Sequence, residues 1–333
     1  IGNDQQYYKM GSDVSCNLGS TNIVNMMETT DFERSVDTMV RALTFVSDNS
    51  NLDIVPSVQN GNRELHAVGL GAMGLHAFFA KAIDFTNAYF LMLNYYTLLA
   101  SNKIAKERGE SFFEFEKSAY ADGSYFNKYL MADWSPKTDK VKAIFEKHHF
   151  PTKHDWAMLK ESIQKHGLYN AYRMAIAPTG SISYVNDSTA SLHPIINKIE
   201  ERQEKKIGKI YYPAPYLGTD TLPYYESAYN LDMRKVIDVY ATAQQHIDQG
   251  MALTLFMRST IPAGLYEWKN GRTDKMTTRD LNILRMYAYH KGIKSIYYVR
   301  TYTDDMEEFG VNECESCSIW LIGIGHIKNV ELV

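Results

Sequence analysis

Apolar residues recur at helical spacing in five stretches of the chain, with short apolar runs between them. The spacing predicts amphipathic helices over residues 31–47, 154–166, 231–249 and 277–291, and a largely buried helix over 84–109. Short strands are predicted over 172–177, 252–257 and 295–300, each just after a helical stretch. This alternation favours an α/β architecture with parallel strands, whose carboxyl-end loops usually carry the chemistry. Without repeats or a low-complexity linker, the chain is expected to form one continuous unit.

The stretch "VGLGAMGLHAFF" (68–79) superficially resembles a dinucleotide-binding fingerprint. Gly69, Gly71 and Gly74 match the G-x-G-x-x-G spacing, but that motif needs a preceding strand and a later acidic residue. The preceding "NGNRELHA" is a poor strand sequence. We therefore interpret residues 70–80 as a glycine-tolerant helix packed closely on its neighbours, and not as a nucleotide-cofactor site.

Composition narrows the class of protein. With 333 residues, 45% of them hydrophobic and 22% charged, the chain is expected to be globular with a substantial core. A net charge of −4 without a basic stripe argues against a nucleic acid polymer as partner. No apolar run approaches the roughly 20 residues that cross a bilayer, so no membrane association and a cytoplasmic location are expected.

The segment "MAIAPTGSISYVND" leads from a predicted strand into a loop rich in hydroxyl groups around Gly180. Backbone N–H groups, hydroxyls and a helix start suit a phosphate, although an ordinary strand-to-helix turn with a Ser or Thr cap has the same pattern. The spacing and the lysine of a Walker motif are absent. The pattern alone leaves both interpretations open.

Cysteines and tyrosines supply the other candidates. Cys314 and Cys317 form a C-x-x-C pair, which suits thiol–disulfide exchange, or zinc if two further ligands existed. The histidines at 148, 149 and 154 lie in a polar stretch that we interpret as solvated surface. Cys16 alone is typical of a buried filler, unless a partner thiol lies near it. Tyr297 and Tyr298 would stack only if the backbone departed from regular strand geometry, so on their own they indicate core packing.

Five ordered segments resemble the catalytic subunit of class I ribonucleotide reductase, most closely the class Ib ribonucleoside-diphosphate reductase α chain. They are "SDVSCNLGSTNI", "GLGAMGLHAFFAK", "AIAPTGSISYVNDSTASLHPI", "SIYYVRT" and "NECESCSI". The resemblance covers nearly all of residues 10–319 but only the C-terminal half of the family's chain. It implies an α/β fold that is the second half of a ten-stranded barrel with surrounding helices (1–306), a mobile redox tail (307–319) and an apolar extension that it does not explain (320–333).

The resemblance also implies roles for single residues. Cys16 matches one thiol of the active-site dithiol that reduces the ribose, and Tyr297 and Tyr298 match the stacked pair that relays a radical. Cys314 and Cys317 match the tail dithiol that re-reduces the active site. The loop that holds the substrate diphosphate is matched by Pro178, Thr179, Gly180, Ser181 and Ile182.

The family's other components are expected as partners. These are the N-terminal half of the catalytic subunit, with its radical-bearing cysteine and second active-site thiol, the small subunit whose dimetal centre supplies the radical, thioredoxin or glutaredoxin, and a ribonucleoside diphosphate. This chain is expected to bind no cofactor or metal and to be inactive alone. Nucleotide effectors are expected only as ligands of the full complex. The alternatives are a stand-alone dithiol oxidoreductase that uses only the tail pair, and a non-catalytic remnant.

Overall fold

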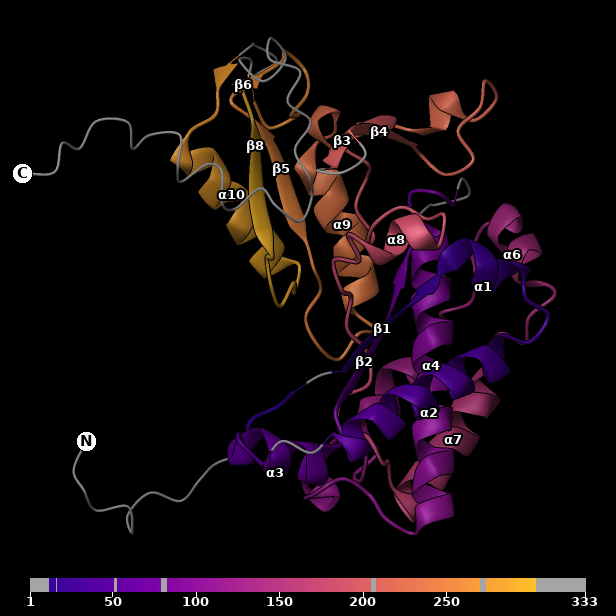
Figure 1. The fold of residues 1–333 in the computed structure, drawn as a ribbon. Coiled ribbons are helices and arrows are strands. Elements are labelled where there is room, and N and C mark those ends of the chain that lie inside the picture. The colour runs from indigo at the N-terminus through magenta and orange to yellow at the C-terminus, as the bar shows by residue number, and fades with distance from the viewer. Residues whose placement is uncertain are drawn as a thin grey trace, which may run out of the picture. The chain divides into compact units, whose positions relative to one another are not determined.

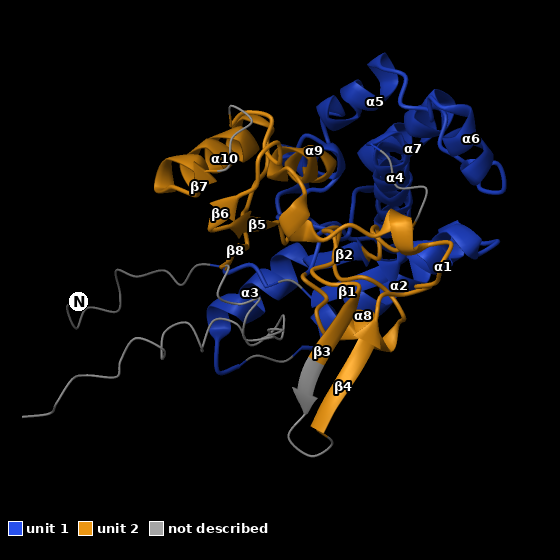
Figure 2. Cartoon of the chain, turned by 90° about the horizontal axis from the view of Figure 1, so that it is seen from above, with its two compact units in different colours: residues 1–72, 80–177, 241–251 blue, residues 73–79, 178–240, 252–333 orange. Residues whose placement is uncertain are grey.

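The computed structural model describes residues 12–15, 17–50, 53–78, 83–204, 208–269 and 274–303. Helices and short strands alternate, as expected for an α/β protein (Figure 1). Two compact units emerge, one of residues 1–72, 80–177 and 241–251 and the other of residues 73–79, 178–240 and 252–333 (Figure 2). The chain passes between the units several times, so no single linker separates them.

The first unit is mainly helical. It contains β1 (Asn17–Asn22), α1 (Ile23–Glu28), α2 (Phe32–Asn49), α3 (Pro56–Leu65), most of β2 (Val68–Met73), α4 (Ile83–Arg108), η2 (Phe115–Lys117), η3 (Ser124–Phe126), α5 (Asn127–Met131), α6 (Asp139–Phe145) and α7 (Lys153–His166). The second unit contains α8 (Ile182–Val185), β3 (Ile199–Glu204), β4 (Gly208–Pro213), η4 (Leu222–Tyr224), η5 (Ala228–Asn230), most of α9 (Met233–Gln244), β5 (Thr254–Arg258), β6 (Thr260–Ile261), β7 (Asp274–Lys275), α10 (Thr278–His290) and β8 (Tyr298–Tyr302).

The five predicted helices are confirmed as α2, α4, α7, α9 and α10, although α9 ends at Gln244, five residues before the predicted end. Polar caps explain three of the starts. Asp31 accepts a hydrogen bond from the backbone N–H of Arg34, while Thr152 and Thr277 form reciprocal capping boxes with the acidic residues three positions later. The central helix α4 is buried along most of its length, as its apolar circumference predicts. In the described part of the chain, every helix is too short or too polar to span a bilayer.

The glycine-rich stretch is a strand, so the predicted helix over 70–80 is wrong. β2 is fully buried, and its residues exchange backbone hydrogen bonds with the segment after α7: the Leu70 N–H donates to the Arg173 carbonyl, and the Ala175 N–H to the Leu70 carbonyl. A Cβ at Gly71 would lie 2.1 Å from the Ala175 carbonyl oxygen. Here glycine permits close approach of a parallel neighbour. Because Gly69 and Gly71 lie inside the strand, they cannot form the turn of a dinucleotide site.

Substitution of Gly71 by alanine is expected to destabilise the first unit by about 3 kcal/mol or more, because a backbone carbonyl cannot rotate away as a side chain can. Chemical denaturation measures the loss. Gly218→Ala is the matched control, since a Cβ at that position comes no closer than 3.9 Å to another atom. Equal stability of the two variants would contradict the close approach.

The remaining predicted strands are shifted or shorter than expected. β5 and β8 begin two and three residues later than predicted and pair in parallel, with Thr254 opposite Tyr298 and Phe256 opposite Arg300. The predicted strand 172–177 makes only parallel bridges, Met174 to Leu70 and Ile176 to Met251. Two antiparallel hairpins, β3–β4 and β6–β7, have no counterpart among the predicted elements. Parallel pairing is therefore confirmed, while strand bounds are not.

Candidate functional site

The loop after Pro178 is held in a strained conformation. Thr179 has a φ of 50°, in the left-handed region that residues with a side chain seldom adopt. Its hydroxyl accepts a hydrogen bond of 2.7 Å from the Ser191 backbone N–H, and its carbonyl accepts one of 3.1 Å from Ser183. Such strain, of about 1–3 kcal/mol, persists where surrounding contacts fix it, often at functional sites. The buried Thr179 thus fixes the start of the loop through its two hydrogen bonds. Gly180 and Ser181 form the turn that leads into α8.

The tyrosine pair lies where β8 begins. Tyr297 precedes the strand and donates its backbone N–H to the Leu253 carbonyl (2.8 Å), whereas Tyr298 is the first strand residue. Their ring centroids are 4.0 Å apart with planes tilted by 51°, and the Tyr298 hydroxyl donates to the Tyr297 hydroxyl across 3.3 Å. The rings meet because only one of the two residues belongs to the regular strand.

A cavity of about 180 Å³ brings the loop and the tyrosine pair together within the second unit. Pro178, Gly180 and Ser181 of the loop line it together with both Tyr297 and Tyr298. Thr179 and Ile182 are not among its lining residues. His193 and Arg300 also line this cavity, and neither was predicted from the sequence. The only sequence signal was that Arg300 lies two positions after Tyr298, and therefore on the same face of a strand.

The three candidate thiols, Cys16, Cys314 and Cys317, lie outside the described residues. The segments on either side of Cys16 are described, and both are held within the first unit. Before it, Asp13 donates its backbone N–H to the Ser57 carbonyl of α3 (3.0 Å), and a Cβ at Gly61 would come within 2.0 Å of the Asp13 carbonyl oxygen. After it, β1 pairs with β2, and Thr21 donates its hydroxyl to the Gly71 carbonyl (3.1 Å).

The interpretation of the histidine stretch as solvated surface is wrong for His148. That ring is only 8% exposed, its Nε2 lies 3.2 Å from the Met27 carbonyl oxygen, and it packs edge-on against Phe32. Burial lowers the pKa of His148. His149 is exposed and pairs with Asp155 across 3.2 Å. A chain reversal after α6 turns His148 inward, which a local polar pattern does not indicate.

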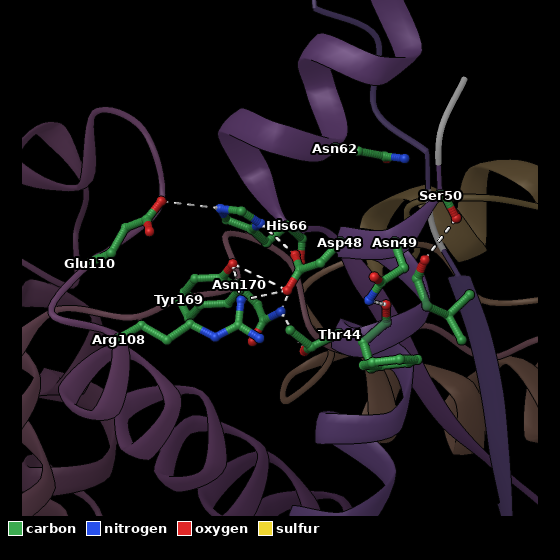
Figure 3. A network of polar contacts seen from close by, with 12 residues as sticks. Thr44, Asp48, Asn49, Ser50, Asn62, His66, Arg108, Glu110, Tyr169 and Asn170 are labelled. Atoms are coloured by element: carbon green, nitrogen blue, oxygen red, sulfur yellow. Dashed lines mark hydrogen bonds and ion pairs between the residues drawn. The ribbon is translucent and has the colours of Figure 1, made fainter. Parts of the chain in front are cut away.

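A charged network in the first unit lies around Asp48, at the end of α2 (Figure 3). Its carboxylate accepts hydrogen bonds from His66 Nδ1 (2.9 Å), Arg108 (2.5 Å) and the Tyr169 hydroxyl (3.2 Å). Tyr169 stacks on the His66 ring at 4.0 Å, and the Arg108 guanidinium lies 4.3 Å from the Tyr169 ring centre. These contacts join the ends of three helices, α2, α3 and α4, so the network fixes the helix that holds the segment before Cys16.

Asp48 makes this network dependent on pH. Burial alone would raise the pKa of its carboxyl group, but hydrogen bonds from His66 and Arg108 outweigh burial and hold that pKa below its usual value. A lowered pKa in the folded state stabilises the protein above the unfolded pKa of about 4, and this contribution is lost as pH falls through the folded value.

The Asp48→Asn variant is therefore expected to lose about 1–3 kcal/mol of stability at pH 7, because a neutral amide cannot replace the carboxylate that accepts hydrogen bonds from both His66 and Arg108. The gap between variant and wild type should narrow below about pH 4, as protonation removes the same charge from wild type. Urea denaturation from pH 7 down to about pH 2.5, well below the unfolded pKa of about 4, tests this. Asp139→Asn, at a fully exposed carboxylate that pairs with Lys142, is the control and should show little effect.

The chain is similar to proteins of known family. A family model described as the ribonucleotide reductase barrel domain matches residues 4–299. The ribonucleoside-diphosphate reductase subunit alpha of Bacillus subtilis is 45% identical over 93% of this chain and 43% of its own length. The corresponding protein of Mycoplasma pneumoniae is 44% identical over 95% of this chain and 44% of its own length. The nrdEB subunit alpha of Bacillus phage SPbeta is 44% identical over 93% of this chain and 28% of its own length. This chain thus spans less than half the length of these relatives.

Proposed function

Since the chain belongs to the ribonucleotide reductase family, we propose that it is the C-terminal part of a catalytic subunit that reduces ribonucleoside diphosphates to deoxyribonucleoside diphosphates. The observation that carries this proposal is that Pro178, Gly180 and Ser181 of the loop line one cavity together with both tyrosines. A diphosphate-binding loop and a radical relay are useful together only if both serve the same ribose.

The second half of a ten-stranded barrel is the proposed architecture. Five extended segments are connected by successive pairings, each of them within one unit. β1 pairs with β2, Leu70 bridges Met174, Ile176 bridges Met251, and β5 pairs with β8. Parallel pairing, observed in the last three cases, is the arrangement such a barrel requires. The other five strands would come from the part of the subunit that this sequence lacks.

Reduction of the ribose consumes two thiols. The 2′-hydroxyl leaves as water, a hydrogen takes its place, and the two electrons come from two cysteines that become a disulfide. Cys16 is proposed as one of these cysteines, with its partner in the missing half. Cys314 and Cys317 are proposed to re-reduce that disulfide by exchange, and thioredoxin or glutaredoxin to re-reduce them in turn.

The tyrosine pair is proposed to carry the oxidising equivalent from the small subunit toward the ribose. Two observations support this role: the hydroxyls are joined by a hydrogen bond of 3.3 Å, and 47% of the Tyr297 surface is exposed in this chain. The dimetal centre that generates the radical belongs to the small subunit, so the chain itself needs no bound cofactor for this step. Nucleotide effectors would bind to the full complex.

The deciding assay mixes the chain with the N-terminal half, a radical-generating small subunit and a dithiol, and follows deoxynucleotide formation. We expect turnover only when all components are present. Turnover by the chain alone, or disulfide exchange that needs neither the small subunit nor the tyrosines, would favour a stand-alone dithiol oxidoreductase. Binding without turnover in the complete mixture would indicate a non-catalytic remnant.

A further inference from the structure

The charge of the cavity beside the tyrosine pair is one-sided. Among its described lining residues, the ionisable groups other than the tyrosines are the basic side chains Arg300 and His193, and no carboxylate is present. The chain as a whole carries more acidic than basic residues, 39 against 35. The described lining of this cavity is thus basic although the chain as a whole is acidic. Such a lining is suited to an anionic ligand.

Strand geometry directs Arg300 toward this cavity. Tyr298 and Arg300 are two positions apart in β8 and therefore point to the same face. In the parallel register, Thr254 lies opposite Tyr298 and Phe256 lies opposite Arg300, and both β5 residues also line the cavity. Arg300 is thus presented by a paired strand rather than by a loop.

His193 reaches the cavity from a different segment. Its side chain is buried, with 7% exposed, and its Nδ1 lies 2.9 Å from the Pro194 carbonyl oxygen. The ring packs 5.3 Å from the ring of Phe256, the residue that pairs with Arg300. Backbone and aromatic contacts therefore hold the imidazole beside Phe256, the β5 residue that lies opposite Arg300.

The loop supplies hydrogen-bond donors but no formal charge. Gly180 and Ser181 offer backbone N–H groups and a hydroxyl, and α8 is a single turn of four residues, so its dipole is small. A nucleoside diphosphate carries about three negative charges at neutral pH, based on a second phosphate pKa near 6. A guanidinium fits phosphate oxygens with two parallel hydrogen bonds.

We propose that Arg300, assisted by His193, binds the diphosphate of the substrate and sets the preference for two phosphates over one. This inference rests on the proposed function, because it names the charge that accompanies the proposed diphosphate loop. Arg300 would determine the affinity for the substrate. Tyr298, two residues earlier in β8, would instead determine the turnover rate.

The test compares Arg300→Gln with wild type in the assembled enzyme. We expect KM for a ribonucleoside diphosphate to rise about 10- to 100-fold with little change in kcat, as for loss of a charge-assisted hydrogen bond. Inhibition by inorganic pyrophosphate should weaken by the same factor, and Arg300→Lys, which keeps the charge, should lie between the two. His193→Gln should show a smaller loss. Arg285→Gln, on the exposed face of α10, is the matched control and should leave KM unchanged.

Calorimetric binding of inorganic pyrophosphate to the full chain separates this inference from the proposed function. If the complete mixture shows no turnover but pyrophosphate binds wild type and not Arg300→Gln, the function fails and the anion site stands. Failure of wild type to bind pyrophosphate overturns the site. Equal affinities of wild type and Arg300→Gln also overturn it, as does a loss of kcat at unchanged KM. Thermal unfolding of each variant checks that the fold is retained.

Discussion

Replacing Cys16 with serine is expected to abolish deoxynucleotide formation by the assembled enzyme with every reductant, because a hydroxyl cannot form the disulfide that supplies two electrons. Cys314→Ser is expected to behave differently. It should retain activity with a small dithiol, which can reach the active site directly, and lose activity with thioredoxin or glutaredoxin. Steady-state rates with the two kinds of reductant measure the contrast.

The comparison of the two cysteine variants distinguishes an active-site thiol from a tail thiol that re-reduces the active site. Equal loss of Cys314→Ser activity with both reductants would refute the shuttle role of the tail. Residual multiple turnover by Cys16→Ser would refute its role as an active-site thiol. Quenched-flow measurement of the first turnover gives a second reading, since Cys314→Ser should complete one turnover without any added reductant.

Replacing Tyr298 with phenylalanine is expected to abolish turnover while leaving substrate affinity and stability close to those of wild type. The benzene ring keeps the packing against Tyr297 but has no hydroxyl to lose a proton and an electron. The hydrogen bond between the two hydroxyls, 3.3 Å long, is lost as well. Turnover assays with substrate-binding measurements test this separation of rate from affinity.

Tyr302→Phe is the matched control for that experiment, because Tyr302 belongs to the same strand and lies on the same face four residues later. It packs against Tyr229, with ring centres 5.2 Å apart, and does not line the cavity. Full activity of Tyr298→Phe would contradict the relay, and equal loss in both variants would point to damage of β8 instead.

Much of the fold followed from local pattern. Helices such as α2 and α10 were predicted because their apolar periodicity and their capping residues lie within one stretch of sequence. β2 was mistaken for a helix because a glycine-rich apolar run has no decisive period, and its identity depends on the approach of Ala175, about a hundred residues away. A tertiary contact also explains the burial of His148, which lies in a polar stretch of sequence but contacts the Met27 carbonyl.

The site was predicted in parts rather than as a whole. Family resemblance pointed to the 178–182 loop and to the tyrosines. The residue pattern alone left an ordinary capped turn open for the loop and indicated core packing for the tyrosines. Neither indicated that both would line one cavity, since they are far apart in sequence. Arg300 and His193 were missed because an isolated basic residue has no local signature. Their proximity is visible only in the structure. There both residues line one cavity, and His193 packs against Phe256, which lies opposite Arg300.

The parallel pair of β5 and β8 has a consequence for handling the protein. Among the described strands, β8 pairs only with β5, so its other side is an outer edge. Open edges present backbone donors and acceptors that recruit strands from other molecules. Preparations of this chain by itself should therefore self-associate as concentration rises, and co-expression with the complementary half should improve the yield of dispersed protein.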